Sequence, residues 1–266
     1  MVEGFKPGGW LGTKNSFEVS FCVTGNDFSG TFVVVEGADA SGKQTQVGRL
    51  AEWLRFENRS DIDPGVEQDL LDRMPGRYPD PTMDKVEDSI MDGVWRLSFP
   101  SYGQTPGGRV VRSYLNGELG NRDDVSLEDI IDIFAADRKQ FKELIREYLE
   151  GGGIVVCDRY REANLIHQLV DFEGEEWEQR LEYIKGIDSD LPDADRVFYL
   201  DISPEAARER MSDRDKDIHE QDFEYMKKSN LNGQRVAEHE DWTLIDGERG
   251  KDDVERDLRD EIKKLL

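Results

Sequence analysis

The sequence predicts an α/β fold in which a five-stranded parallel sheet is flanked by layers of helices. Short apolar runs that end in a polar residue or a turn are typical of buried parallel strands. Stretches with apolar residues at helical spacing separate these runs, as a layered α/β architecture requires. The five predicted strands are residues 32–36, 95–99, 154–158, 196–202 and 243–245.

The segments between the strands carry helix signals. Apolar residues at helical spacing predict a helix from Lys43 to about Phe56. A second helix is predicted to begin at the cap-like Ser126 and to continue through residue 149, where three glycines stop it. Pro204 fits the first position of a further helix, which follows the fourth strand.

Two regions are additional to this framework. Residues 1–30 form an N-terminal extension with one plausible strand at residues 17–23, and residues 31–266 form the main domain. An insertion at about residues 58–92 is rich in proline, glycine and acids, which predicts loops with one short helix around residues 66–74. Neither region contains recognisable chemistry.

The charge balance is strongly acidic. The 266 residues include 35 Lys and Arg against 59 Asp and Glu, a formal net charge of −24. Such a balance argues against a general surface for nucleic acids or anionic membranes. Because the acids are spread along a chain that also has apolar strands, we hypothesise a folded protein adapted to high salt, in which counterions screen the repulsion.

Cysteine content and hydropathy indicate the compartment. Cys22 and Cys157 are too few for a disulfide framework, which favours a reducing environment. The chain has no apolar run of membrane-spanning length, and residues 1–30 have no signal-peptide core. We therefore expect a cytoplasmic protein.

A glycine loop directly follows the first predicted strand and ends at a lysine. Gly37 and Gly42 lack Cβ atoms, so the backbone can wrap a polyphosphate with its N–H groups, while Lys43 and the helix that it opens add positive charge. A chance glycine-rich turn is the alternative, which the strand before and the helix after disfavour. The usual Ser or Thr ligand of magnesium is replaced by Gln44. The predicted phosphate-binding residues are Gly37, Ala38, Asp39, Ala40, Ser41, Gly42, Lys43, Gln44 and Thr45.

Other polar segments follow the remaining strands. Ligands of an open α/β sheet bind beyond the carboxyl ends of its strands, so these segments are expected to converge. They are residues 99–105, residues 158–160, and the arginines at 208, 210 and 214 after the fourth strand.

From residue 32 to its end, the chain resembles the thymidylate kinase family. The matching motifs stand in family order: EGADASGKQTQ, FPSYGQT, IFAADRKQF, CDRYREANLIHQ and an arginine-bearing segment near RERMSDRD. The resemblance implies a three-layer P-loop NTPase fold with a short arginine-bearing lid. It also implies transfer of the ATP γ-phosphoryl group to dTMP with Mg²⁺, and a homodimer.

The resemblance also implies roles at the phosphates. Lys43 would hold the ATP phosphates, and Arg159 would grip the acceptor phosphate. Asp39 would lie near the sugar 3′-hydroxyl and the magnesium, and Asp158 would be an outer carboxylate of the metal site. The lid residues Arg210 and Arg214 would neutralise charge on the transferring group.

At the base, Phe99 and Phe134 would sandwich the thymine ring. Arg138, expected at the pocket rim, would donate to a base oxygen, and Asn164 and His167 would border base and sugar, with Tyr102 nearby. Each residue has a structural alternative. The two phenylalanines and Tyr102 suit a core, Arg138 suits a solvated helix face, and Asp158 with Arg159 suits a structural ion pair. His167 suits a packing gap, and the lid arginines suit surface charge balance.

Two departures from the family pattern leave other functions open. Gln44 has no hydroxyl for magnesium, and Ser101 and Tyr102 stand where the family often has an arginine, for which Arg109 or Arg112 would substitute. One alternative is a kinase of another nucleoside monophosphate or of a deoxynucleoside. The other is a nucleotide-binding regulator whose catalysis has lapsed.

Overall fold

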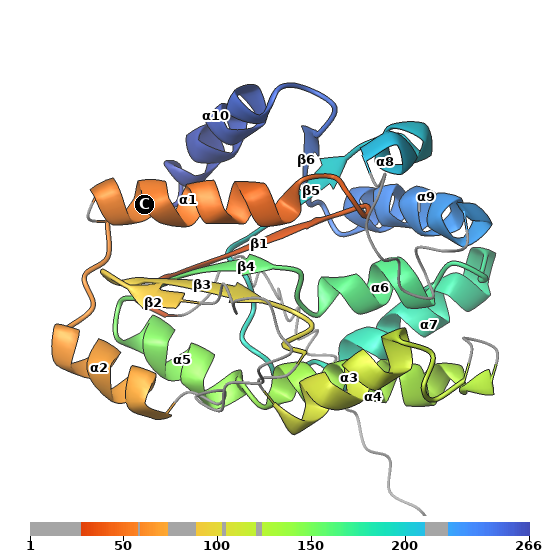
Figure 1. The fold of residues 1–266 in the computed structure, drawn as a ribbon, viewed down its shortest axis with the longest axis horizontal. Coiled ribbons are helices and arrows are strands. Elements are labelled where there is room, and N and C mark those ends of the chain that lie inside the picture. Colours follow the sequence, from red (N-terminus) through yellow and green to blue (C-terminus); the bar gives the residue numbers. More distant parts are fainter. Residues whose placement is uncertain (1–27, 58, 74–88, 103–104, 121–123, 211–222) are drawn as a thin grey trace, which may run out of the picture.

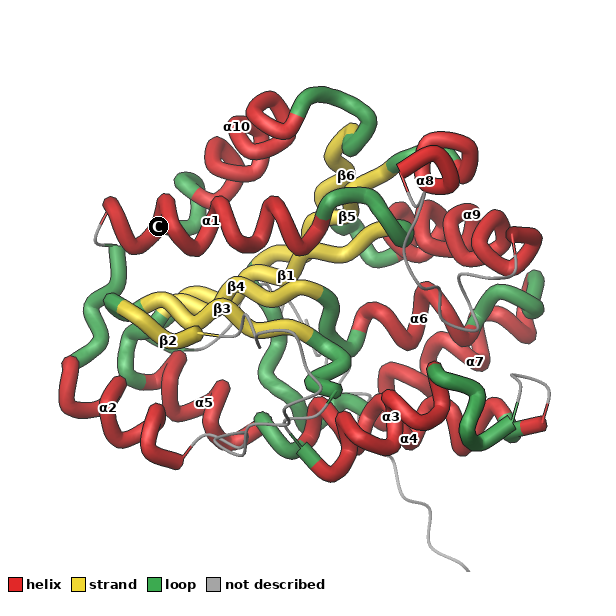
Figure 2. Tube along the Cα trace, viewed as in Figure 1, coloured by secondary structure: helices red, strands yellow, loops and turns green. Residues whose placement is uncertain are grey.

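A computed structural model describes residues 28–57, 59–73, 89–102, 105–120, 124–210 and 223–266. One sheet lies between two layers of helices, and the strands run through the middle of the molecule (Figure 1, Figure 2). The sheet order is β2-β3-β4-β1-β5-β6, in which every neighbouring pair except β2 and β3 is parallel. The strands are β1 (Thr31–Gly37), β2 (Ser89–Met91), β3 (Val94–Ser98), β4 (Ile154–Asp158), β5 (Arg196–Asp201) and β6 (Thr243–Asp246).

The expected count of five strands is wrong, because β2 adds a sixth within the region predicted as an insertion. This three-residue strand pairs antiparallel with β3 through a tight turn at Asp92 and Gly93, which both have positive φ angles. An Asp-Gly pair between short apolar runs is a hairpin signal, so this strand has a recognisable sequence pattern. The five predicted parallel strands are confirmed.

Alternating residues of the central strand β1 build the two halves of the core. Val33 and Val35 pack with α1 (Lys43–Glu57) and α10 (Lys251–Ile262) on one face of the sheet. Phe32 and Val34 pack with α5 (Lys142–Glu150) on the other face. Because side chains alternate along a strand, a run of consecutive apolar residues indicates a strand that is buried on both faces, as β1 is.

The single helix predicted from Ser126 to residue 149 is two helices, α4 (Leu127–Lys139) and α5. Phe141 lies at the break, where its buried ring packs 5.3 Å from the ring of Phe99 and 6.4 Å from that of Trp95. The break therefore lets Phe141 reach the underside of the sheet. The Ser126 cap is confirmed, since its Oγ accepts a hydrogen bond from the Asp129 N–H.

The other helices complete the layers. They are α2 (Pro64–Arg73), α3 (Pro106–Leu115), α6 (Glu162–Gln168), α7 (Gly174–Ile187), α8 (Pro204–Arg210) and α9 (Phe223–His239). The short helix predicted in the insertion corresponds to α2, and Pro204 begins α8 as predicted. Within the described residues, no helix is both long enough and apolar enough to cross a bilayer. The strand predicted at residues 17–23 lies outside the described residues.

Candidate active site

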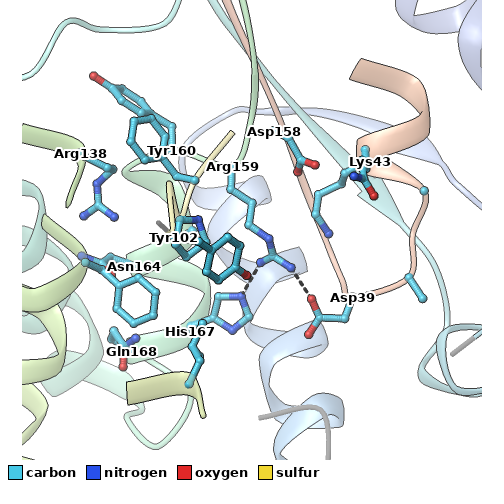
Figure 3. A pocket seen from close by; sticks show the side chains of 18 of the residues that line it. Asp39, Lys43, Tyr102, Arg138, Asp158, Arg159, Tyr160, Asn164, His167 and Gln168 are labelled. Carbon is cyan, nitrogen blue, oxygen red and sulfur yellow. Dashed lines mark hydrogen bonds and ion pairs between the residues drawn. The ribbon is translucent and has the colours of Figure 1, made fainter. Parts of the chain in front are cut away.

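A pocket of about 390 Å³ lies beyond the carboxyl ends of β1, β3 and β4 (Figure 3). Segments that follow these strands form one part of its lining, and residues of α3, α4, α6 and α8 form the rest. Among the residues predicted from the sequence, those that line it are Asp39, Ala40, Gly42, Lys43, Gln44, Thr45, Phe99, Tyr102, Phe134, Arg138, Asp158, Arg159, Asn164, His167 and Arg210. The expected convergence of these segments is therefore observed.

The glycine loop between β1 and α1 has the backbone of a phosphate cradle. Gly42 has a φ of +97° and Ala40 a φ of +59°, a conformation that turns successive N–H groups around the loop. At Gly37 a Cβ atom would lie 2.5 Å from the Leu200 carbonyl oxygen, so only glycine fits there. The loop opens the amino end of α1, which favours an anion.

Lys43 is held by its own loop. Its Nζ donates to the carbonyl oxygens of Ala38 at 2.7 Å and Gly37 at 3.0 Å, and the residue is buried. Burial, reinforced by the Arg159 cation, lowers the pKa of Lys43 to about 8. A polyphosphate in the loop would therefore meet a desolvated ammonium group whose present partners are neutral carbonyls.

Arg159 lies between Asp39 and His167 and contacts both side chains. One guanidinium nitrogen forms an ion pair with Asp39, and the other lies 2.9 Å from Nε2 of His167 (Figure 3). Burial opposes ionisation of Asp39, but the Arg159 and Lys43 charges outweigh it and hold the pKa of this carboxyl well below its usual range. The His167 ring is stacked in turn on Tyr225 of α9, with 6.3 Å between ring centroids. Arg159 is thus fixed at the centre of the pocket.

Of the two predicted metal residues, Asp39 and Asp158, the latter fits a magnesium site better; Asp158 is the last residue of β4. Its Oδ1 is buried and has no hydrogen-bond partner among the described residues, and burial raises its pKa. A carboxylate oxygen without a partner, next to a phosphate cradle, is the kind of group that Mg²⁺ and its water shell take up. Asp39, the other predicted metal residue, is engaged with Arg159. No cluster of three or more potential metal ligands occurs in the described part of the chain.

Aromatic and polar groups form the other end of the pocket. Phe99 is buried against Tyr160 and Phe141, and Phe134 is half-buried against Tyr114. Figure 3 shows Arg138 and Asn164 at this end, away from Lys43. The two predicted ring residues therefore contact the core and also line the pocket.

The expectation that Arg138 lies at the pocket rim is wrong. Its side chain is 2% exposed, and its Nη2 donates to Oδ2 of Asp188 at 2.5 Å. Asp188 lies at the end of α7, 50 residues further along the chain. This partner, which no local pattern reveals, explains why Arg138 is buried.

The family model for thymidylate kinase matches residues 92–258, more than half of the chain. The chain belongs to the thymidylate kinase family. The matched stretch begins after the glycine loop, so the loop geometry is an observation independent of that match.

Named relatives agree with the family. The thymidylate kinase of Prochlorococcus marinus (strain NATL2A) is 27% identical over 242 residues, covering 89% of this chain and 98% of the relative. That of Plasmodium falciparum is 28% identical over 243 residues, with coverage of 91% and 94%. The solved thymidylate kinase of Candida albicans superposes with a TM-score of 0.62 at 20% identity, covering 89% of this chain and 92% of that one. The α/β fold is therefore that of a thymidylate kinase.

Sequence reasoning missed several residues of the site in this family member. Asp137 is buried and accepts hydrogen bonds from the Ser101 N–H at 2.7 Å and from the Thr105 hydroxyl at 2.8 Å, so it holds the segment after β3 in place. Glu36 is fully buried and accepts from the Tyr160 N–H at 2.9 Å. Their positions in the sequence could have identified them, because Asp137 directly precedes Arg138 and Glu36 directly precedes the glycine loop. Leu115, Ala163 and Gln168 line the pocket and were not predicted, whereas Pro100 and Tyr160 belong to segments that were expected to converge but had no assigned role.

Of the two arginines predicted for the lid, Arg210 is among the described residues and Arg214 is not. Arg210 ends α8, lines the pocket and donates to the carbonyl oxygens of Gly247 at 3.0 Å and Glu248 at 3.4 Å. Arg214 lies outside the described residues. Arg109 and Arg112, the suggested substitutes for the missing arginine, lie on α3 and are not among the pocket residues.

Proposed function

We propose that this chain transfers the γ-phosphoryl group of ATP to dTMP and forms dTDP and ADP. One observation carries the proposal: a single pocket has a phosphate cradle with Lys43 at one end and aromatic rings with Arg138 at the other. A pocket of this form would bring a polyphosphate and a nucleoside monophosphate together. The chain belongs to the thymidylate kinase family, which supports dTMP as the acceptor.

The phosphate groups would be held by the cradle and by Arg159. Phosphoryl transfer depends mainly on positioning and on charge stabilisation, because the protein has little covalent chemistry to supply. The loop N–H groups and Lys43 would bind the donor phosphates, while Arg159 would leave Asp39 to grip the acceptor phosphate. Arg210 and Arg214 would add charge near the transferring group.

The base and the sugar would lie among the remaining lining residues. Phe99 and Phe134 present rings to the pocket, Asn164 and His167 lie on α6, and Tyr102 follows β3. Thymine O4 accepts hydrogen bonds, whereas the cytosine amino group donates them. A guanidinium at Arg138 would therefore favour dTMP over dCMP.

Mg²⁺ belongs to this proposal as the metal of the ATP complex. It would neutralise phosphate charge when bound, with Asp158 as the protein group that fits its water shell. Gln44 supplies no hydroxyl there, so this metal site would rely on phosphates, water and carboxylates. A homodimer, a cytoplasmic location and adaptation to high salt also remain proposals, because they rest on family resemblance and composition.

The test is an ADP-release assay with a panel of acceptors, run in both low and molar salt. We expect turnover with dTMP well above that with dCMP, dAMP or dGMP, and none with thymidine, which has no phosphate for Arg159. Preference for another monophosphate or for a nucleoside would contradict the proposal. ATP binding without turnover of any acceptor would indicate a lapsed enzyme instead.

A further inference from the structure

The ion pair between Arg138 and Asp188 connects the nucleotide pocket to a part of the molecule behind it. Both side chains are 2% exposed, and their closest nitrogen and oxygen atoms are 2.5 Å apart. Arg138 lines the pocket, whereas Asp188 lines a separate cavity of about 650 Å³. Asp188 therefore contacts a residue of the pocket without lining the pocket itself.

The pair leaves part of the Arg138 guanidinium without a partner. Among the described residues, Asp188 is the only hydrogen-bond partner of this side chain, and the buried Nε has none. A guanidinium has five N–H donors in a rigid fork, so fixing one arm fixes the direction of the others. Figure 3 shows this side chain, like that of Asn164, at the end of the pocket away from Lys43.

We propose that Asp188 is a positioning residue for acceptor selection: it holds Arg138 so that the remaining N–H donors face the edge of the acceptor base. A base with a carbonyl oxygen at that edge is accepted, and a base with an amino group there is rejected. This inference rests on the proposed function, because it assumes that the acceptor base occupies the end of the pocket near Arg138.

Glu162 is a second acid that lines the same cavity as Asp188. It is buried, but among the described residues it pairs with Arg161, at 3.3 Å. Asp188 is at the end of α7 and forms the short contact to Arg138. The geometry therefore assigns the positioning role to Asp188.

Asp193→Asn provides a matched control for Asp188→Asn. Asp193 follows α7 as well, lines the same second cavity and forms an ion pair with an arginine, Arg161. Neither Asp193 nor Arg161 lines the nucleotide pocket. Both substitutions remove one negative charge and keep the side-chain shape. They differ in burial, because the Asp193 side chain is 57% exposed and that of Asp188 is 2% exposed, and in the arginine affected, since Arg161 keeps Glu162 as a partner.

The experiment measures kcat and KM for dTMP, dCMP and ATP in the parent and both variants. For Asp188→Asn we expect kcat/KM for dTMP to fall by about 10- to 100-fold, mostly through KM, with a narrower lead over dCMP and an unchanged KM for ATP. For Asp193→Asn we expect every constant to stay within about twofold of the parent. Equal behaviour of the two variants would overturn the assignment.

Chemical rescue separates positioning from a general effect on the fold. Asp188→Ala removes a carboxylate that lines the 650 Å³ cavity, so formate entering from this cavity would restore a negative charge next to Arg138. Formate should lower the dTMP KM of this variant, whereas chloride at equal ionic strength should not. Identical effects of both salts would contradict the inference.

A double variant covers the case in which the single variants do not fold. Arg138→Met with Asp188→Leu removes both buried charges, and a folded double variant with full dTMP preference would also contradict the inference.

Activity of the parent enzyme on dTMP separates failure of the proposed function from failure of this inference. If the parent does not act on dTMP, the proposed function fails, and the inference fails with it. If the parent prefers dTMP and Asp188→Asn retains that preference in full, the inference alone fails.

Discussion

Replacing Arg138 with Ala should destabilise the protein strongly, in contrast to the small effect expected for an arginine at a pocket rim. The substitution leaves the Asp188 carboxylate 2% exposed and without its partner, and Oδ1 of Asp188 already has no hydrogen-bond partner among the described residues. Removing one member of a buried ion pair typically costs about 3–5 kcal/mol. For a domain of this size each kcal/mol lowers Tm by roughly 2–4 °C, so we expect a fall of about 6–20 °C.

Thermal and urea unfolding of two further variants tests this reasoning. Arg73 pairs with Asp69 and Glu147 on the surface, with a side chain that is 42% exposed, so Arg73→Ala should leave Tm nearly unchanged. Adding Asp188→Leu to Arg138→Ala should restore part of the loss, because no buried charge then stands alone. If Arg138→Ala lowers Tm as little as Arg73→Ala, the Arg138–Asp188 pair does not stabilise the fold as a buried ion pair should.

Three other predictions concern salt, pH and the metal site. Because the net charge is −24, Tm should rise from low to molar potassium chloride, and a flat or falling Tm would reject salt adaptation. Burial raises the pKa of Glu36 from 4.5 to about 8, so the folded protein keeps a proton that the unfolded chain releases, and stability should fall as pH rises from about 4.5 to 8. Glu36→Gln stays neutral and should flatten that slope in urea unfolding; an unchanged slope would show that another group causes it. Asp158→Asn should lower kcat by about 10²- to 10³-fold, whereas Gln44→Ser should be mild or activating; equal kcat values for Asp158→Asn and the parent across magnesium concentrations would contradict the role of Asp158.

Local patterns predicted most of the fold. The β-branched run of β1, the glycine loop after it and the start of α8 depend on residues that are adjacent in sequence. The break between α4 and α5 was not predictable in this way, because it depends on Phe141 packing under Trp95 and Phe99 from other parts of the chain. A helix-period pattern continues through a break when both helices bury apolar faces.

In the site, as in the fold, features set by adjacent residues were predictable and pairings between distant residues were not. The residues that follow each strand were predicted to converge because the carboxyl ends of parallel strands share an edge, and they do line one pocket. The burial of Arg138 and the pairing of Arg159 with Asp39 depend on partners 50 and 120 residues away. Sequence separation of this size hides which charged groups are paired, and pairing determines which of them remain free to bind a ligand.

The most direct test of the account is to identify the reaction products. The parent enzyme, incubated with ATP, Mg²⁺ and dTMP, should form dTDP and ADP in equal amounts, as measured by chromatography. Lys43→Met, which removes the ammonium group of the phosphate cradle, should lose most of this turnover while its far-ultraviolet circular dichroism stays that of the parent. ADP without dTDP, or equal dTDP formation by Lys43→Met, would contradict the claim that this pocket carries out phosphoryl transfer to dTMP.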